Sequence, residues 1–301
     1  MADRRPLWPA RLHHLGLVSA DAGALAGFYR RVLGYDGEEL SQGQWRLAAK
    51  ERQLLVSQGA EAGLGFAAFA VEDAARLEAL RADIEAKGAE IGPSPSPLLD
   101  DNAFAVEDPD GNTLVFGPPG EARAGGGDGG LPSPKRSSGF AQAGADALPG
   151  RLQHFVVASA AIKPMMAFYQ DVLGFVLSDV VNDGDGDPAA VFYRSDPEHH
   201  SFAIFRADHP GFDHHAYESD CWNDIRDWAD HLSALRVPMF WGPGRHGPGD
   251  NLFVMFRDPD GNTLEISAEL ELMPYDMAHR EWPHDARTLN LWGDAWFRSE
   301  P

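Results

Sequence analysis

The chain contains two copies of one sequence unit. The first copy begins RLHHLGLVSADAGALAGFYRRVLGY at residues 11–35, and the second begins RLQHFVVASAAIKPMMAFYQDVLGF at residues 151–175. Each copy ends on nearly the same peptide, DPDGNTLVF at residues 108–116 and DPDGNTLEI at residues 258–266. Because the repeat covers most of the 301 residues, we expect two similar modules and not one continuous domain.

The copies differ where a metal ligand would stand. Glu265 of the second copy stands where the first copy has Val115. The histidine pair at 214–215 stands where the first copy has Ala67. The second copy also has His154 on its first expected strand. A repeat that keeps its pattern but carries these ligand types in one copy predicts one working site, in the second module.

Composition excludes some classes of partner. The formal net charge is −21, with no cluster of Lys and Arg that would neutralise phosphates, so we expect no nucleic-acid partner. No apolar run approaches the roughly 20 residues of a membrane span, and no signal peptide is recognisable, so the expected location is the cytoplasm. The single cysteine, Cys221, excludes an intrachain disulfide and fits a reducing compartment.

The expected organisation follows the repeat. It comprises an N-terminal module without metal at 1–118, a Gly/Pro-rich linker at 119–150, a C-terminal metal-binding module at 151–273 and a Trp-rich tail at 274–301. We expect the tail to anchor to the body or to another subunit, and the alternative is that part of it covers the pocket.

Both modules show the same order of elements. In the first, strand 12–18, helix 21–33, strand signals at 45–56, strand 65–71 and helix 73–88 precede the DPDGN turn; in the second, the same elements fall at 152–158, 161–173, 189–206, 212–218 and 220–236. Glycines 34 and 174 are suited to end the first helices. The prediction is an α+β fold of two modules, each built from paired βαβββ units that form a curved, barrel-like mixed sheet with helices outside.

Strand alternation places the candidate ligands. Phe155 and Val157 share one face of their strand, so His154 faces the other, concave side. Glu265 lies between Leu264 and Ile266 and faces inward by the same argument. Only one of His214 and His215 can face inward, and periodicity alone leaves the choice open. Two imidazoles and one carboxylate suit Fe(II) or Mn(II) better than a closed zinc site.

These motifs resemble those of the two-domain type I extradiol ring-cleavage dioxygenases, which belong to the vicinal oxygen chelate (glyoxalase/bleomycin resistance) superfamily. The resemblance covers nearly the whole chain apart from the linker and the tail. His154 and His215 are 61 residues apart, and His215 and Glu265 are 50 apart, which matches the spacing of the family's Fe(II) ligands. The resemblance therefore implies His154, His215 and Glu265 as the ligands.

The resemblance also implies a substrate pocket beside the metal. His200 and His246 fall at the family's catalytic positions, and Phe192 and Val156 fall at positions that line the pocket. Met255 stands where the family has a tyrosine that binds a substrate hydroxyl, and methionine cannot donate that bond. Tyr193 and Tyr217 are the sequence candidates to replace it.

The expected function is Fe(II)-dependent cleavage of the ring of a catechol-type diol with O2, with Mn(II) as the alternative metal. His246 would favour the deprotonated diol, and His200 would act as a general acid. The alternatives are another metal-dependent isomerase, lyase or hydrolase on the same scaffold, which Met255 suggests, and a non-catalytic protein that binds an aromatic ligand. The Trp-rich tail also predicts a homo-oligomer.

Overall fold

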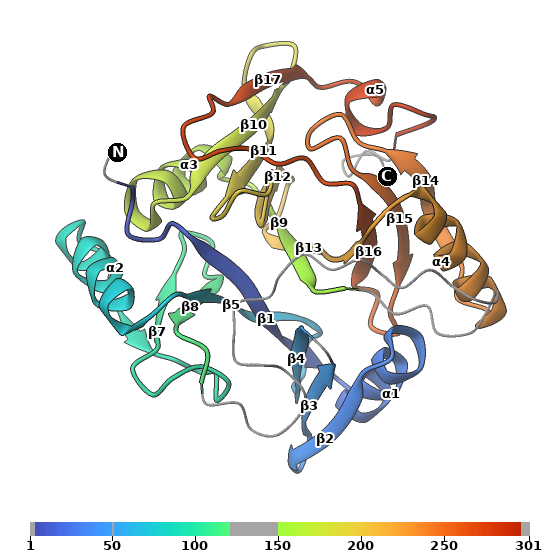
Figure 1. Ribbon diagram of the computed structural model, residues 1–301, viewed down its shortest axis with the longest axis horizontal. Helices are drawn as coiled ribbons and strands as arrows, with labels where there is room; N and C mark the ends of the chain where they lie inside the picture. The colour runs from blue at the N-terminus through green and yellow to red at the C-terminus, as the bar shows by residue number, and fades with distance from the viewer. Residues whose placement is uncertain (1–3, 50, 121–149, 296–301) are drawn as a thin grey trace.

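The fold consists of two mixed sheets that follow one another along the chain. The computed structural model describes residues 4–49, 51–120 and 150–295 (Figure 1). The sheets are curved and open, with helices at the periphery, as expected for an α+β fold of two related modules. Most of the expected linker lies outside the described residues. Among the described residues, no helix is long and apolar enough to cross a membrane.

The first sheet has eight strands in the order β2-β3-β4-β1-β5-β8-β7-β6. Their bounds are β1 Ala10–Ser19, β2 Asp36–Ser41, β3 Gln44–Ala49, β4 Arg52–Gln58, β5 Gly63–Val71, β6 Gly92–Pro93, β7 Phe104–Glu107 and β8 Thr113–Gly117. The expected strands at 12–18 and 65–71 are β1 and β5, and the signal at 45–56 is the β3–β4 hairpin.

The second sheet has nine strands in the order β14-β15-β16-β13-β9-β12-β11-β10-β17. Their bounds are β9 Leu152–Ser159, β10 Val176–Asn182, β11 Pro188–Arg194, β12 Phe202–Arg206, β13 Gly211–Ser219, β14 Met239–Arg245, β15 Leu252–Arg257, β16 Thr263–Ala268 and β17 Arg280–Pro283. The ninth strand, β17, comes from the tail and pairs with β10 in parallel. The tail is thus anchored to the body of its own chain.

Helices cover the outer faces. Their bounds are α1 Ala22–Leu33, α2 Ala74–Ala86, α3 Ile162–Ala167, α4 Trp222–Ala234 and α5 Ala286–Leu289, with a π-helix η1 at Phe168–Leu173. The segment 161–173, expected to be one regular helix, therefore widens to π geometry in its second half. Gly34 and Gly174 end their helices in the left-handed conformation, with φ of 65° and 86°, as expected.

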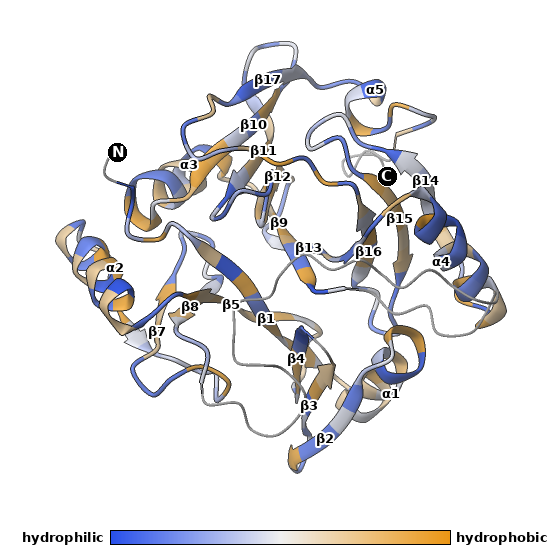
Figure 2. Cartoon of the chain, in the orientation of Figure 1, coloured by the Kyte–Doolittle hydropathy of each residue, from blue (hydrophilic) through white to orange (hydrophobic). Residues whose placement is uncertain are grey.

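One apolar core joins the two modules. It contains the sheet faces that lie under the helices, including Leu15, Phe69, Phe155, Leu264 and Ile266. In Figure 2 β15 is coloured apolar along most of its length, as expected of a strand whose residues 252–256 are all buried. The helices also pair across the module boundary: His231 of α4 bonds the carbonyl of Val32 in α1, at 2.9 Å. Side chains on the opposite face of each sheet point into its concave side.

Candidate metal centre

Three buried ligand types meet on the concave side of the second sheet. His154 comes from β9, His214 from β13 and Glu265 from β16, which are neighbouring strands. Their ligand atoms lie within 4.8 Å of one another. Glu265 Oε2 is 3.5 Å from Nε2 of His154 and 3.4 Å from Nε2 of His214. Two imidazoles and one carboxylate that converge from one side form the donor set of non-haem Fe(II) sites.

The assignment of His215 as a ligand is wrong, because this side chain points into the core. In the pairing of β13 with β9, His215 lies opposite Phe155 and His214 lies opposite Val156. Opposite residues of an antiparallel pair share a face, so His215 joins the core face of Phe155. Its Nε2 lies 3.0 Å from the hydroxyl of Tyr29, in the first module.

A register shift explains why alternation is hard to follow along β13. The pairing with β9 slips between Phe212 and His214, so Asp213 is an extra residue in the strand. On the C-terminal side of the shift, Tyr217 is fully buried in the core, two residues after His215. Residues two apart share a face, so His215 shares the core face of Tyr217, and His214 faces the pocket.

Two further residues, which the sequence did not single out, hold the ligands in place. Asp213 accepts a hydrogen bond from Nδ1 of His214, at 2.5 Å. This bond leaves Nε2 of His214 to face Glu265, and a carboxylate behind a ligand imidazole is common at metal sites. The amide of Asn251 donates to Oε1 of Glu265 at 3.0 Å and to Ser267 at 3.0 Å.

Electrostatics in the site favour a cation. Burial lowers the pKa of His154, so its imidazole is neutral and can be a ligand. Burial alone would raise the pKa of Glu265, but hydrogen bonds with His154 and His214 bring it well below the usual range, so it is ionised. Burial likewise disfavours a charged His214, yet its bonds with Asp213 and Glu265 raise its pKa. The donor set therefore fits a divalent transition metal.

A pocket beside the three ligands encloses about 420 Å³ of empty space, which includes open solvent. Every other residue that the sequence assigned to catalysis or substrate binding lines it: Val156, Phe192, His200, His246 and Met255. The remaining lining residues are Phe205, Trp241, Pro248, Asn251, Thr288 and Leu289. The wall is mostly apolar, and two of its polar residues contact the ligands: Asn251 bonds Glu265, and His200 packs on His154.

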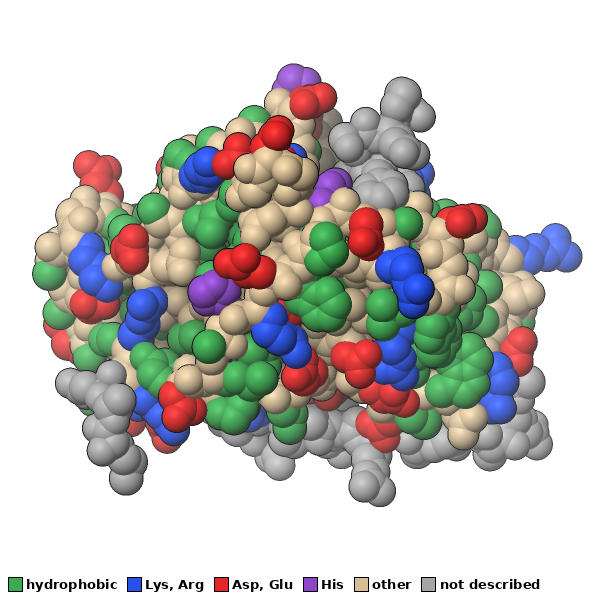
Figure 3. Space-filling model, turned by 90° about the horizontal axis from the view of Figure 1, so that it is seen from above, with side chains coloured by type: hydrophobic (Ala, Val, Ile, Leu, Met, Phe, Trp, Pro, Cys, Tyr) green, Lys and Arg blue, Asp and Glu red, His purple; other side chains and the backbone are tan. Residues whose placement is uncertain are grey.

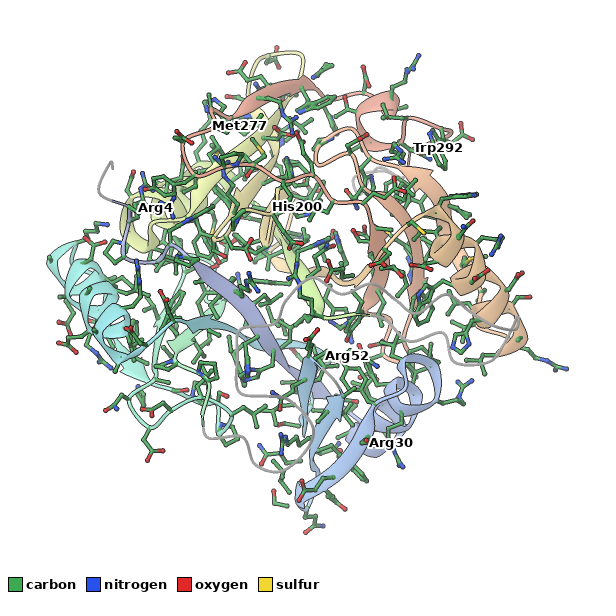
Figure 4. All side chains as sticks on the ribbon, in the orientation of Figure 1. Arg4, Arg30, Arg52, His200, Met277 and Trp292 are labelled. Carbon is green, nitrogen blue, oxygen red and sulfur yellow. The ribbon has the colours of Figure 1, made fainter. Side chains whose placement is uncertain are left out.

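Ring contacts hold both pocket histidines, and a hydrogen bond also holds His246. His246 stacks on Phe253, with ring centroids 3.9 Å apart, and its Nδ1 donates to the carbonyl of Leu289 at 2.6 Å. His200 lies over His154, with ring centroids 4.2 Å apart (Figure 4 labels His200). Burial holds the pKa of His200 well below its usual range, so this side chain is neutral.

Both modules match one superfamily of proteins. The sequence profile described as Glyoxalase/Bleomycin resistance protein/Dioxygenase superfamily matches residues 11–116 and 151–266, one match in each module. The chain belongs to this superfamily. The two matched segments correspond to the two copies of the sequence repeat.

Curated relatives in this superfamily include ring-cleavage dioxygenases. The chain is 32% identical to metapyrocatechase 2 of Cupriavidus necator over 136 residues, which are 45% of this chain and 41% of that protein. It is 25% identical to an iron-dependent extradiol dioxygenase of Rhodococcus jostii over 300 residues, which are 94% of this chain and 95% of that protein. The first relative is thus matched over less than half of its length, and the second over nearly all of it.

Solved structures in the superfamily share the fold. The Mn(II)-bound glyoxalase from Novosphingobium aromaticivorans has a TM-score of 0.77 with this chain at 25% identity, covering 94% of this chain and 91% of that one. The arrangement of two modules is therefore that of an established superfamily fold.

The first module of this superfamily member shows how the site is lost in one copy. His14 stands at the position of His154, Phe66 at that of His214 and Val115 at that of Glu265, as the strand registers show. His14 packs edge-on against Phe66, with ring centroids 5.6 Å apart, and bonds Ser96 at 2.6 Å. One ligand type remains, and apolar side chains occupy the other two positions.

No described tyrosine lines the pocket in place of Met255. Met255 is buried opposite Glu265 in the pairing of β15 with β16, with its side chain against Trp241 and Phe253. Tyr217 lies in the core and accepts a bond from Tyr35, at 3.2 Å. Tyr193 lies in the core too, so neither sequence candidate reaches the substrate position.

The tail contributes to the pocket as well as anchoring to the sheet. Thr288 and Leu289 of α5 line the pocket, and Trp282 of β17 packs against the apolar cluster around Val156 and Phe192. Trp296 lies outside the described residues. The described part of the tail is therefore anchored to its own chain, and two of its residues line the pocket.

Proposed function

We propose that this chain is an Fe(II)-dependent extradiol dioxygenase that cleaves the ring of a catechol-type diol with O2. The observation that carries the proposal is the convergence of His154, His214 and Glu265 with two further histidines, His200 and His246, on one buried pocket. Relatives named metapyrocatechase and iron-dependent extradiol dioxygenase support the reaction type. Mn(II) remains the alternative metal, since a superfamily neighbour is Mn(II)-bound.

Bound Fe(II) would supply open coordination positions for the diol and O2, together with the redox chemistry. The residues of this chain would orient the substrate and move its protons. His246 donates through Nδ1 to the carbonyl of Leu289, so Nε2 is the ring nitrogen that would bond a diol hydroxyl. Phe192, Val156 and Trp241 form an apolar wall that would hold the ring and exclude water.

The test is oxygen uptake by protein loaded anaerobically with Fe(II), using a panel of monocyclic and bicyclic catechols. We expect one O2 consumed per diol and a coloured ring-opened product. The variant Glu265→Val copies the first module and should bind no stoichiometric iron. The variant His200→Ala should keep iron and bind the diol, but cleave it at least about tenfold more slowly. Iron retained by Glu265→Val would contradict the ligand assignment.

A second function is favoured by one observation, the presence of Met255 at the position of the family's tyrosine. It is a metal-dependent isomerase, lyase or hydrolase that uses the same three ligands as a Lewis acid. Absence of oxygen uptake across the panel, with stoichiometric metal and an intact fold, would favour this function over ring cleavage.

We also infer that the chain forms a homo-oligomer that works in the cytoplasm. Trp222 and Trp292 contact each other at 5.4 Å between ring centroids and are 43% and 53% exposed, so a subunit contact would bury apolar surface. On the face shown in Figure 3, acidic side chains are scattered among basic ones without a continuous basic patch. Sedimentation equilibrium would measure the subunit number, and a monomer would contradict the inference.

A further inference from the structure

A second buried histidine stands directly behind His200. His199 is fully buried and does not line the pocket. Its Nδ1 lies 2.9 Å from Nδ1 of His200, and its Nε2 lies 2.9 Å from Oδ2 of Asp179. The sequence showed the pair His199–His200, but only the structure connects it to Asp179 on β10. Asp179, His199 and His200 thus form a chain of hydrogen bonds that ends at the pocket.

Asp179 acts as an acceptor in this chain. Its carboxylate receives bonds from Nε of Arg280 at 2.9 Å and from Nε1 of Trp282 at 2.9 Å, in addition to the contact with His199. Burial alone would raise the pKa of Asp179, but the bonds from His199 and Arg280 bring it below its usual range. An ionised carboxylate can only accept, so Nε2 of His199 carries the hydrogen.

The tautomers of both histidines follow from this bond. Burial lowers the pKa of His199, so the ring is neutral and has one hydrogen, which is on Nε2. Its Nδ1 then has a lone pair and accepts from Nδ1 of His200. Nδ1 of His200 is then the donor of this bond and carries the hydrogen. The other ring nitrogen, Nε2, is left for the pocket, and in the neutral form of the ring it carries a lone pair.

We propose that His199, held by Asp179, is a positioning residue that fixes the tautomer and ring orientation of His200, so that Nε2 of His200 offers the pocket a proton acceptor. The inference deepens the proposed function and rests on it for the role of His200. It also changes that role: His200 takes a proton from the substrate before it can return one as an acid. An imidazole held in one tautomer by a carboxylate is the arrangement that serine hydrolases use.

The same bonds give the accepted proton a balanced path. When Nε2 of His200 gains a proton, the hydrogen on Nδ1 of His200 can move to Nδ1 of His199. His200 is then neutral again, with its hydrogen on Nε2, and the imidazolium of His199 lies against the ionised Asp179. The reverse movement returns the proton to the substrate, and no other group gains or loses one.

The C-terminal tail holds this chain in place. Arg280 of β17 lies opposite Asp179 in the strand pairing and bonds both Asp179 and Glu271. Glu271 also accepts a backbone bond from His199, through its carbonyl, at 2.8 Å. One network therefore fixes Asp179, Arg280 and the backbone of His199. The tail thus anchors the sheet and, through His199, helps to orient His200.

The direct test is the tautomer of His200 in the full chain carrying Zn(II), which is diamagnetic, by long-range ¹⁵N–¹H correlation spectra of histidine-labelled protein. The variant His200→Gln assigns the signals. We expect Nδ1 of His200 to be protonated and Nε2 to be unprotonated in the wild-type protein. A protonated Nε2 would overturn the inference. Because this measurement needs no turnover, it stands even if the chain proves not to cleave catechols.

Kinetics with Fe(II)-loaded variants give the second test. His199→Phe keeps a ring of similar size but removes the acceptor, and His199→Gln keeps a donor that can reach Asp179. Both should lower kcat at least about tenfold, with KM changed by less than threefold and stoichiometric iron retained. The control His231→Gln replaces a histidine that bonds the carbonyl of Val32 and does not line the pocket, and we expect less than a threefold change in kcat. Wild-type kcat in both His199 variants, with intact iron and thermal stability, would overturn the positioning role.

Discussion

Tyr29 of the first module donates a hydrogen bond to Asp258 of the second, at 3.1 Å, with both side chains buried. The reciprocal bond, from Tyr169 of the second module to Asp108 of the first, is 2.9 Å long. Each tyrosine follows the phenylalanine of the repeated helix, and each aspartate begins a DPDGN turn. The repeat therefore encodes a symmetric connection, in which the helix of each module bonds the turn of the other.

We predict that Tyr29→Phe lowers the free energy of unfolding by about 1–3 kcal/mol, because Asp258 loses a buried donor and His215 loses its partner. Urea unfolding of the metal-free protein measures this change. Tyr275→Phe is the control, since the hydroxyl of Tyr275 makes only an exposed contact with the backbone of Arg5, and we expect a change within about 0.5 kcal/mol. Equal effects of the two substitutions would contradict the role of the connection between modules.

The two histidines of the pair at 214–215 should separate in their effects on metal binding. We predict that His214→Asn loses iron at micromolar protein concentration, whereas His215→Gln retains one iron per chain but unfolds at lower urea concentration. The reason is that His214 faces Glu265 and His215 faces the core. Iron analysis after desalting measures both. Iron loss in His215→Gln with retention in His214→Asn would restore the assignment made from sequence spacing.

This pair also marks how far the sequence alone could predict the site. The matching peptides predicted the repeat, and the order of elements predicted the α+β class. Regular alternation in β9 and β16 predicted that His154 and Glu265 face inward. Alternation alone left the choice between His214 and His215 open, and the family spacing selected His215, one residue away from the side chain that faces Glu265. The register shift at Asp213 interrupts the alternation at this place. The supports of the site could not be found in this way. Asn251 and Asp179 bond residues that are 14 and 20 positions away in the chain, and Asp213 bonds its own neighbour His214 only because the register shift turns the two side chains together.

Asn251 should affect iron affinity without being a ligand. Its amide bonds Oε1 of Glu265, so we predict that Asn251→Ala lowers iron affinity about 10- to 100-fold. Ser267→Ala is the matched control, because it removes the other bond of the same amide and leaves the contact with Glu265. Competition with a chelator measures both constants. An unchanged constant in Asn251→Ala would show that Glu265 needs no such support.

Stability should depend on pH through a buried cluster between the modules. The cluster combines three carboxylates with two guanidinium groups: Asp196, Glu198, Glu218, Arg11 and Arg151. Burial, and then the neighbouring charge of Glu198, raises the pKa of Asp196 to about 6 from its usual 3.8. A carboxyl whose pKa is higher in the folded state stabilises the fold below the unfolded pKa, and this contribution is lost as the pH rises through the folded pKa.

We therefore predict that the free energy of unfolding of the wild-type protein, relative to Asp196→Asn, falls as the pH rises from about 4 to about 6 and is constant above about 7. The amide can still accept the backbone bond from Glu198. Asp208→Asn, at an exposed position, is the control and should show no such trend. If the free energy of unfolding of the wild-type protein, relative to Asp196→Asn, increased as the pH rises, the raised pKa of Asp196 would be contradicted.

The pocket should discriminate against charged substrates. Its described lining contains no Lys or Arg and is mostly apolar, so a substrate carboxylate would be buried without a Lys or Arg partner. We predict that kcat/KM for 4-isobutylcatechol exceeds that for the similarly shaped 3,4-dihydroxyphenylacetate by at least about 100-fold, which is about 3 kcal/mol. Initial oxygen uptake at several diol concentrations measures this ratio. Met255→Lys offers a matched variant, since it places a cation beside the apolar wall and should narrow the ratio, provided that iron stays stoichiometric. A wild-type ratio near one would mean that the substituent does not enter this pocket.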